Sequence, residues 1–265
     1  MKTLTKKRVI LFWSILFFLI FGSMLHGKAA NAETGKGDSR PLQILCLGDS
    51  ITQSADVYCG YRYPLWKKLV DLGIEFDLIG SMEERYFEDP SGQCPDYKGR
   101  KFDPDHEGHW GWHIEHILGI QKDFPEGSGS GSLPVWLKEY TPDIVLLHLG
   151  HNDAGMGETP NQMAKELEQV ILALRKDNPN VSILLAKVIP SAKPLWNSRL
   201  DALNAEIDGI ARKMNIPASR VIVVDFTKGF NPQEDTIDGT HPNSLGSEKM
   251  AQKWFESIVE LLKEK

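Results

Sequence analysis

The sequence predicts an α/β protein in which helices cover both faces of a parallel sheet. Short, continuous runs of Ile, Leu and Val alternate along the chain with longer segments whose apolar residues recur every three or four positions. Runs of the first kind are typical of strands buried on both faces, and patterns of the second kind are typical of amphipathic helices. Their alternation indicates parallel strands joined by helical crossovers, in one domain of about 230 residues.

Five strands are expected, each from a continuous apolar run: Leu42–Leu47, Phe76–Ile79, Ile144–Leu149, Ile183–Val188 and Val221–Val224. Four helices are expected from the remaining pattern: Tyr63–Leu72, Pro160–Lys176, Arg199–Met214 and Ser244–Lys263. Within the second of these helices, Leu167, Ile171 and Leu174 would lie on one face, as a helix packed on a sheet requires.

Two stretches do not follow this alternation. Residues 82–116 hold several Gly, Pro and aromatic residues with little periodicity, and an irregular stretch of this kind in a compact domain often forms a functional site. Residues 126–132 read Glu-Gly-Ser-Gly-Ser-Gly-Ser, a composition that predicts a flexible connector.

The N-terminal segment, residues 1–32, predicts a secretory signal peptide. A basic start at positions 6–8 precedes the apolar run Val9–Leu25, and Ala30-Asn31-Ala32 offers a small-residue cleavage site. An uncleaved membrane anchor is the alternative, because the apolar run approaches the length of a membrane span. Residues 33–41 are then a short polar linker, and residues 42–265 form the folded domain of a secreted, extracellular or periplasmic protein.

The net charge of −6 combines two unlike parts of the chain. The predicted signal peptide carries five of the basic side chains and no acidic one, so its own charge is +5. All of the acidic side chains lie in positions 33–265, which therefore carry a net charge of −11. Binding to phosphate backbones needs clustered Lys and Arg, so this acidic part of the chain is not expected to bind nucleic acid.

Export permits disulfides, and the chain has three cysteines. Cys46 lies within the first predicted strand, where a buried, inert thiol is expected. Cys59 and Cys94 lie in Gly-, Pro- and Tyr-rich stretches, and we expect a bridge between them. Two unpaired thiols are the alternative, because sequence alone does not fix connectivity.

Three polar motifs follow predicted strands or lie near the C-terminus: Gly48-Asp49-Ser50, Gly150-His151-Asn152-Asp153 and Asp238-Gly239-Thr240-His241-Pro242. Each alone has a plain structural explanation, since Ser50 could cap a helix, Asn152 could occupy a turn and His241 could lie in a solvated loop. Together they supply a hydroxyl nucleophile, a side-chain amide donor, and an imidazole whose tautomer a nearby carboxylate on the same loop can hold. These are the groups that acyl transfer requires.

These motifs resemble the first, third and fifth conserved blocks of the GDSL/SGNH hydrolases. The second block, a Gly that donates its amide to the oxyanion hole, resembles the segment Glu107 to Trp112, in which Gly111 holds the donor position. The similarity covers nearly all of residues 42–260 and is greatest to secreted, acetylxylan-esterase-like carbohydrate esterases. The resemblance implies a three-layer α/β/α sandwich with a flavodoxin-like, five-stranded parallel sheet, and it adds support to the Cys59–Cys94 bridge. The family often has Thr where this chain has His151. Because of this difference, the resemblance does not predict the fine substrate specificity.

The resemblance also implies a serine esterase that needs no metal or other cofactor. Ser50 would attack an ester carbonyl, His241 would take its proton, and Asp238 would orient the imidazole. The backbone N–H groups of Ser50 and Gly111 and the side-chain amide of Asn152 would form the oxyanion hole. The expected partner is a small-molecule or polysaccharide ester, most simply an acetyl ester of a carbohydrate.

Three other interpretations are open at this stage. The histidines at positions 106, 109, 113 and 116 have spacings that a helical zinc site uses, although Gly and Trp interrupt any helix there. A non-catalytic carbohydrate-binding protein could stack Trp110 and Trp112 on sugar rings. A lysophospholipase or thioesterase of the same superfamily would need an apolar slot for a long acyl chain.

Overall fold

The computed structural model describes residues 40–54, 60–86 and 94–264, which all belong to one compact unit, Arg40–Lys265. The predicted signal peptide and Cys59 lie outside the described residues, so neither the leader nor the predicted disulfide is tested by this structure. Within the described ranges, none of the helices is both long enough and apolar enough to cross a membrane.

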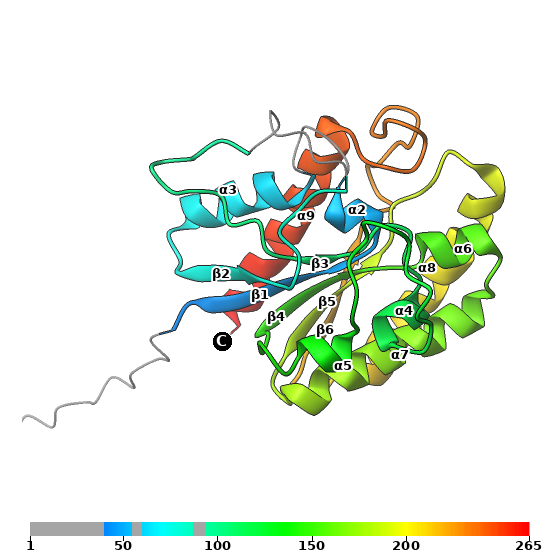
Figure 1. Cartoon of the computed structure of the whole chain (residues 1–265), viewed down its shortest axis with the longest axis horizontal. Coiled ribbons are helices and arrows are strands. Elements are labelled where there is room, and N and C mark those ends of the chain that lie inside the picture. Colours follow the sequence, from blue (N-terminus) through cyan, green and yellow to red (C-terminus); the bar gives the residue numbers. More distant parts are fainter. Residues whose placement is uncertain (1–39, 55–59, 87–93, 265) are drawn as a thin grey trace, which may run out of the picture. The chain divides into compact units, whose positions relative to one another are not determined.

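All five predicted strands are confirmed, and they form one parallel sheet in the order β2-β1-β4-β5-β6 (Figure 1). Their bounds lie close to the predicted ones: β1 Leu42–Gly48, β2 Phe76–Ile79, β4 Ile144–His148, β5 Ser182–Lys187 and β6 Val221–Asp225. A further short strand, β3 (Glu107–Gly108), pairs with the end of β1 through Leu47 and Gly48. The carboxyl ends of all these strands therefore lie along one edge of the sheet.

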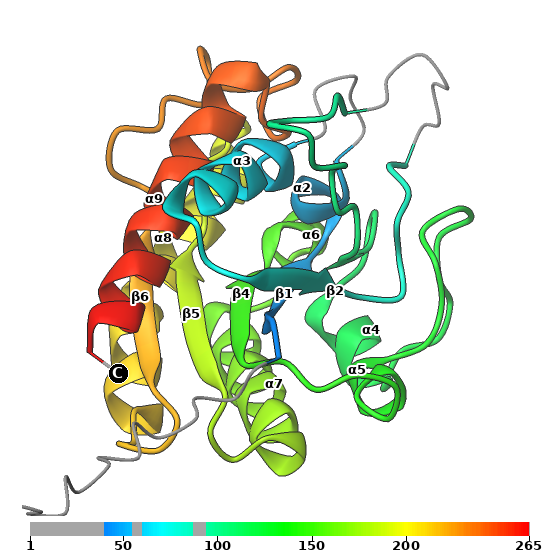
Figure 2. The ribbon, with the colours of Figure 1, turned by 90° about the vertical axis from the view of Figure 1, so that its left-hand side faces the viewer.

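Helices cover the sheet on both faces, as predicted (Figure 2). Helices α3 (Arg62–Leu72) and α9 (Ser244–Lys263) pack against each other, and α7 (Pro160–Asp177) and α8 (Pro194–Met214) form the corresponding pair on the opposite face. The predicted start of α8, at Arg199, was too late. Pro194 occupies the first turn, where proline is favoured, but Leu195 beside it is exposed and so adds nothing to the periodic apolar pattern.

The central strands are buried on both sides, which explains why their sequences do not alternate. Every residue of β4 is buried, and so is β1 from Ile44 to its end. Cys46 in β1 is a free thiol with no exposed surface, and burial raises its pKa to about 12, so the expectation of an inert thiol is confirmed. Gly48 ends β1 where no side chain would fit: a Cβ there would lie 2.7 Å from the His148 carbonyl oxygen.

The structure contains four short helices that the sequence did not predict: α2 (Ser50–Gln53), α4 (Ile114–Leu118), α5 (Leu133–Trp136) and α6 (His151–Met156). None of them completes two turns, so no periodic pattern can develop. Two of them, α2 and α6, directly follow the carboxyl ends of β1 and β4. They turn the polar motifs of the sequence into helix starts at the edge of the sheet.

The prediction of a flexible connector at residues 126–132 is wrong. Ser128 has no exposed surface, its hydroxyl accepts the indole N–H of Trp112 (2.7 Å), and its carbonyl lies 2.8 Å from His109 Nδ1. The glycines serve close packing: a Cβ on Gly129 would lie 2.9 Å from that same His109 nitrogen, and one on Gly131 would lie 2.4 Å from the Trp136 indole nitrogen. Here the small residues allow aromatic rings to approach the backbone, and composition alone does not distinguish that use from flexibility.

Candidate active site

The predicted site residues lie on segments that follow the carboxyl ends of β1, β3, β4 and β6. Ser50 is the first residue of α2 after β1, and Asn152 lies in the first turn of α6 after β4. Gly111 lies in the turn that follows β3, and Asp238 and His241 lie in the long segment between β6 and α9. Four segments that are far apart in the sequence thus supply the site.

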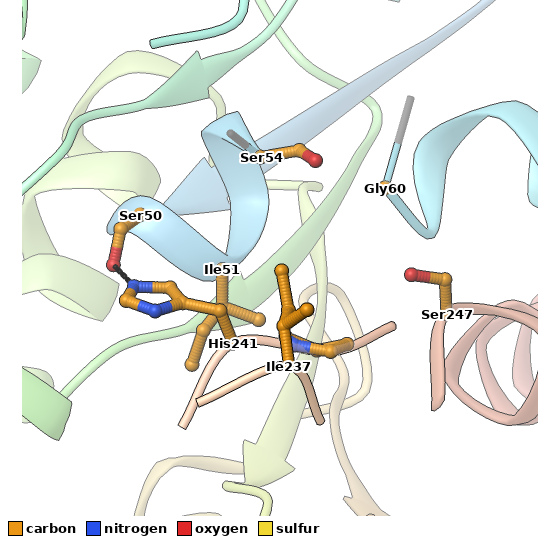
Figure 3. Close-up of a pocket in the computed structure, with 8 residues that line it drawn as sticks. Ser50, Ile51, Ser54, Gly60, Ile237, His241 and Ser247 are labelled. Carbon is orange, nitrogen blue, oxygen red and sulfur yellow. Dashed lines mark hydrogen bonds between the residues drawn. The ribbon is translucent and has the colours of Figure 1, made fainter. Parts of the chain in front are cut away.

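Ser50, His241 and Asp238 form one hydrogen-bonded series, of which Figure 3 shows the contact between Ser50 and His241. The Ser50 Oγ lies 3.0 Å from His241 Nε2, and His241 Nδ1 lies 2.7 Å from Asp238 Oδ2. Because a carboxylate only accepts, Nδ1 carries a proton, which leaves Nε2 of the neutral ring as the acceptor for the Ser50 hydroxyl. This is the tautomer in which imidazole can take a proton from a serine.

Asp238 is held in its charged form by the loop that it organises. Its Oδ1 accepts the backbone N–H groups of Thr240 (2.9 Å) and His241 (2.8 Å), while Oδ2 accepts from the His241 ring. Partial burial by itself would raise the pKa of Asp238, but these hydrogen bonds outweigh it and lower the pKa below its ordinary value. The carboxylate therefore both orients the imidazole and stabilises positive charge on it.

The loop that presents His241 depends on a left-handed glycine. Gly239 has a φ of +84°, and a Cβ at this position would lie 2.8 Å from the Ala192 side chain. Its carbonyl accepts the Ala192 N–H at 2.7 Å and the Ser191 hydroxyl at 3.1 Å. The segment after β5 thus supports the turn between Asp238 and His241, which explains the Gly in that motif.

Trp110 lies flat against the candidate base. Its ring is stacked on the His241 ring, with centroids 4.6 Å apart and planes 11° from parallel, and Tyr86 stacks on Trp110 at 4.4 Å. The Trp110 backbone N–H donates to the Gln53 side chain at 2.7 Å, which joins this segment to α2. An aromatic face beside an imidazole supports the position of the ring. Sequence reasoning had offered Trp110 only as a sugar platform or core residue.

The three donors predicted for the oxyanion hole are not all used in hydrogen bonds within the described residues. Gly111 has a φ of +76°, and its N–H makes no hydrogen bond to any group within the described ranges. The Ser50 N–H belongs to the first turn of a helix, where backbone donors have no intrahelical partner. Asn152 donates one amide hydrogen of Nδ2 to the Trp112 carbonyl at 2.8 Å, which leaves its second hydrogen available.

A small hollow opens next to the Ser50–His241 pair (Figure 3). It measures about 250 Å³, including space open to solvent, and its lining residues are Ser50, Ile51, Ser54, Gly60, Ile237, His241, Pro242 and Ser247. Ile237 is more than half exposed at its edge. The hollow is lined by both polar and apolar side chains, and Ser50 and His241 lie at its edge.

His151 lies beneath the site rather than at its surface. It is buried, its Nε2 lies 3.0 Å from the Ile189 carbonyl, and its ring stacks on His148 at 5.4 Å. Burial, followed by the neighbouring His148 and His241, lowers the pKa of His151 well below its ordinary value. His151 is therefore a neutral ring behind the catalytic edge.

The histidines between positions 106 and 116 serve separate structural contacts. His106 Nδ1 accepts the Gly108 N–H at 2.9 Å, His109 lies between two indole rings, and His116 Nδ1 accepts the His113 N–H at 2.9 Å. Across the part of the chain that the structure describes, no group of three or more His, Cys, Asp or Glu side chains is arranged to hold a metal ion.

The chain belongs to the GDSL-like lipase/acylhydrolase family, which it matches over residues 87–249. It is 28% identical over 232 residues to a multidomain esterase of Ruminococcus flavefaciens, an alignment that covers 84% of this chain and 29% of that protein. The structure resembles a carbohydrate esterase family 3 from Talaromyces cellulolyticus, with a TM-score of 0.69, 28% identity, and coverage of 84% of this chain and 99% of the other. A family 3 carbohydrate esterase of Clostridium thermocellum gives a TM-score of 0.65 at 26% identity, with coverage of 84% and 98%.

The chain spans 28% to 63% of the lengths of the first three curated relatives that it matches. In contrast, it covers nearly the whole of the two solved carbohydrate esterases. The similarity therefore concerns one domain, and the family resemblance drawn from the sequence motifs is confirmed for that domain.

Proposed function

We propose that this protein is a serine esterase in which Ser50 is the nucleophile, His241 the general base and Asp238 the residue that orients it. The observation that carries the proposal is the hydrogen-bonded series Ser50–His241–Asp238, whose nucleophile and base are 191 positions apart in the chain. Membership of the GDSL-like lipase/acylhydrolase family supports the same chemistry.

The proposed reaction has two halves. The Ser50 Oγ attacks the ester carbonyl carbon while its proton passes to His241 Nε2, and the carbonyl oxygen becomes an oxyanion. The N–H groups of Ser50 and Gly111 and the free amide hydrogen of Asn152 stabilise that oxyanion. The C–O bond to the alcohol then breaks and the alcohol takes the proton from Nε2. Water, activated by His241, releases the acid from Ser50 in the same way.

Replacement of Ser50 by Ala tests the nucleophile. The variant is expected to lose labelling by a fluorophosphonate and nearly all turnover of p-nitrophenyl acetate, because it lacks the hydroxyl that His241 activates to form the acyl intermediate. Ser257→Ala, on α9 and bonded to the Lys253 carbonyl, serves as a matched control that should label normally. Full labelling of Ser50→Ala would refute the assignment.

We further propose that the substrate is an acetyl ester of a carbohydrate. The solved relatives are titled carbohydrate esterases, and a further one, at 27% identity, is titled an acetyl esterase. Activity on acetate, butyrate and decanoate esters is the test, and acetate is expected to give the highest kcat/KM. A steady rise of kcat/KM with chain length would instead support the lysophospholipase or thioesterase alternative.

The non-catalytic alternative has less support than the sequence first suggested. Trp112 has no exposed surface and cannot stack on a sugar, and the ring of Trp110 lies against His241. Turnover of p-nitrophenyl acetate that disappears in His241→Ala would exclude a binding-only role.

Export and the Cys59–Cys94 disulfide complete the proposal. Cys46 is buried in β1, so the two other cysteines are the pair suited to a bridge. In the exported protein, thiol titration is expected to find no reactive thiol in the native state and one after unfolding without reductant. Three thiols after unfolding would exclude the bridge. Cleavage of the leader is tested by N-terminal sequencing, and a sequence that begins at Met1 would exclude it.

A further inference from the structure

The candidate oxyanion donors Gly111 and Asn152 both depend on the position of Trp112. The turn from His109 to Trp112 is closed by a hydrogen bond from the Trp112 N–H to the His109 carbonyl (3.2 Å), with Gly111 at its third position. The Trp112 carbonyl accepts Asn152 Nδ2 at 2.8 Å, which sets the direction of the remaining amide hydrogen. A shift of Trp112 would therefore move two of the three donors together.

Trp112 is itself held by His109 and Ser128. The Trp112 ring is fully buried and lies 4.1 Å from the His109 ring, and its indole N–H donates to Ser128 Oγ at 2.7 Å. The His109 ring also stacks on Trp136, with centroids 4.8 Å apart and planes 4° from parallel. His109 is thus held between two indoles, one of which belongs to the turn that carries Gly111.

Both ring nitrogens of His109 face hydrogen-bond acceptors. Nδ1 lies 2.8 Å from the Ser128 carbonyl, and Nε2 lies 2.7 Å from Glu107 Oε2. A carbonyl only accepts, so Nδ1 carries a proton, and a second proton must lie between Nε2 and the Glu107 carboxyl. These two hydrogen bonds allow only one orientation of the ring in its plane.

Glu107 is fixed by its own partners. Its carboxyl accepts the Ser81 N–H at 2.6 Å, the Ser81 hydroxyl at 3.1 Å and the Tyr140 hydroxyl. The side chains of Glu107 and His109 have no exposed surface. A buried, hydrogen-bonded pair of polar side chains is a weak source of net stability compared with apolar side chains of similar volume, which suggests a role in positioning.

We propose that Glu107 and His109 are positioning residues of the oxyanion hole. The proton between them orients the His109 ring, the ring sets Trp112, and Trp112 sets the Gly111 N–H and the Asn152 amide. Neither residue touches the substrate, so the pair acts on the transition state through these two donors. The inference rests on the proposed esterase function.

Substitution of His109 by Phe tests this proposal. Phe retains a ring between Trp112 and Trp136 but removes both hydrogen bonds. We expect kcat per titrated active site to fall about 10- to 100-fold, part of the loss caused by removing one oxyanion donor, while KM changes by less than about threefold. The affinity for methylboronic acid, which forms a tetrahedral adduct on Ser50, should fall by the same factor as kcat/KM.

Three further variants extend the comparison. Glu107→Gln keeps a hydrogen bond, now from its amide to His109 Nε2, and should recover most of the kcat that Glu107→Ala loses. Ser128→Ala removes the acceptor of the Trp112 indole N–H without touching the pair, and should lower kcat and the boronate affinity about three- to tenfold. If His109→Phe does not fold, the comparison of Glu107→Ala with Glu107→Gln decides the question.

Ser219→Ala is the control for lost stability alone. Ser219 is fully buried and bonds Arg175 and the Val181 carbonyl, away from the carboxyl edge of the sheet. It should lower Tm but leave kcat per active site unchanged. The proposal is overturned if Glu107→Ala, and any folded His109→Phe, keep wild-type kcat and boronate affinity. Failure of the esterase proposal is distinguishable, because wild-type protein would then show no Ser50-dependent turnover.

Discussion

Replacing Asp238 by Asn changes one atom of the hydrogen-bonded series Ser50–His241–Asp238 and keeps the backbone contacts of the loop. Oδ1 of the new side chain can still accept the Thr240 and His241 N–H groups, at 2.9 and 2.8 Å in the native structure. The amide nitrogen, however, replaces an acceptor 2.7 Å from His241 Nδ1. That nitrogen donates, so Nδ1 must become the acceptor and Nε2 must carry the proton, which leaves Ser50 without a base.

The expected loss in kcat is about 10⁴-fold, or about 5.4 kcal/mol at 1.36 kcal/mol per decade. Asp238→Ala should lose less, because the Ala side chain does not force the wrong tautomer on His241. The Asp238 side chain is 51% exposed, so water can replace the carboxylate as acceptor for Nδ1–H, and the Trp110 ring still lies against the imidazole.

The assay is kcat for p-nitrophenyl acetate, normalised to active sites, with Tm as a check on folding. The essential result is the order of the two variants: Asp238→Ala should be more active than Asp238→Asn. An Asn variant within tenfold of wild type, or more active than the Ala variant, would refute the argument from the tautomer.

Three other predictions follow from single positions. Burial, with Asp153 adding to it, raises the pKa of Asp49 to about 7 despite the Ile51 N–H, so folded protein keeps a proton that unfolded chain loses near pH 4. The stability that protonation of Asp49 contributes is therefore complete below about pH 4 and is lost as pH rises to about 7. Asp49→Asn should therefore raise Tm relative to wild type more at pH 8 than at pH 5, and an equal difference would contradict this. Gly129→Ala should lower the free energy of unfolding by about 1–3 kcal/mol in urea, because φ is +84° and the new Cβ would meet His109. Gly209→Ala, in a helix with open space around the Cα, should raise it by about 0.5–1 kcal/mol. Trp110→Ala should lower kcat about three- to tenfold by removing the ring stacked on His241, and an unchanged kcat in steady-state assays would exclude that role.

Most of the fold was predictable because it is expressed in local patterns. The central strands β4 and β5 are buried on both faces and read as apolar runs, and helices such as α7 show the spacing of a single buried face. Short elements such as β3 and α5 were not predictable, since so few residues contain no period. The Gly-Ser segment around Ser128 was predicted to be flexible. Its conformation depends on the aromatic rings that pack against it, which composition does not reveal.

The candidate site divides in the same way. Ser50, Asp238 and His241 were identified because each motif has a recognisable local chemistry and follows the family pattern. The roles of Trp110 and of the Glu107–His109 pair were not identified. Their function depends on contacts with His241, Ser128 and other segments, and no local signal marks a side chain for such contacts.

The sequence by itself determined the class of fold, the acidic character of the predicted domain and the identity of the candidate catalytic groups. All three depend on composition, on periodicity within one segment, or on motifs a few residues long. Only the tertiary structure decided which of these groups meet and how they are oriented. The 3.0 Å contact between Ser50 and His241 joins residues 191 positions apart, and it exists only because parallel strands bring their carboxyl ends to one edge of the sheet.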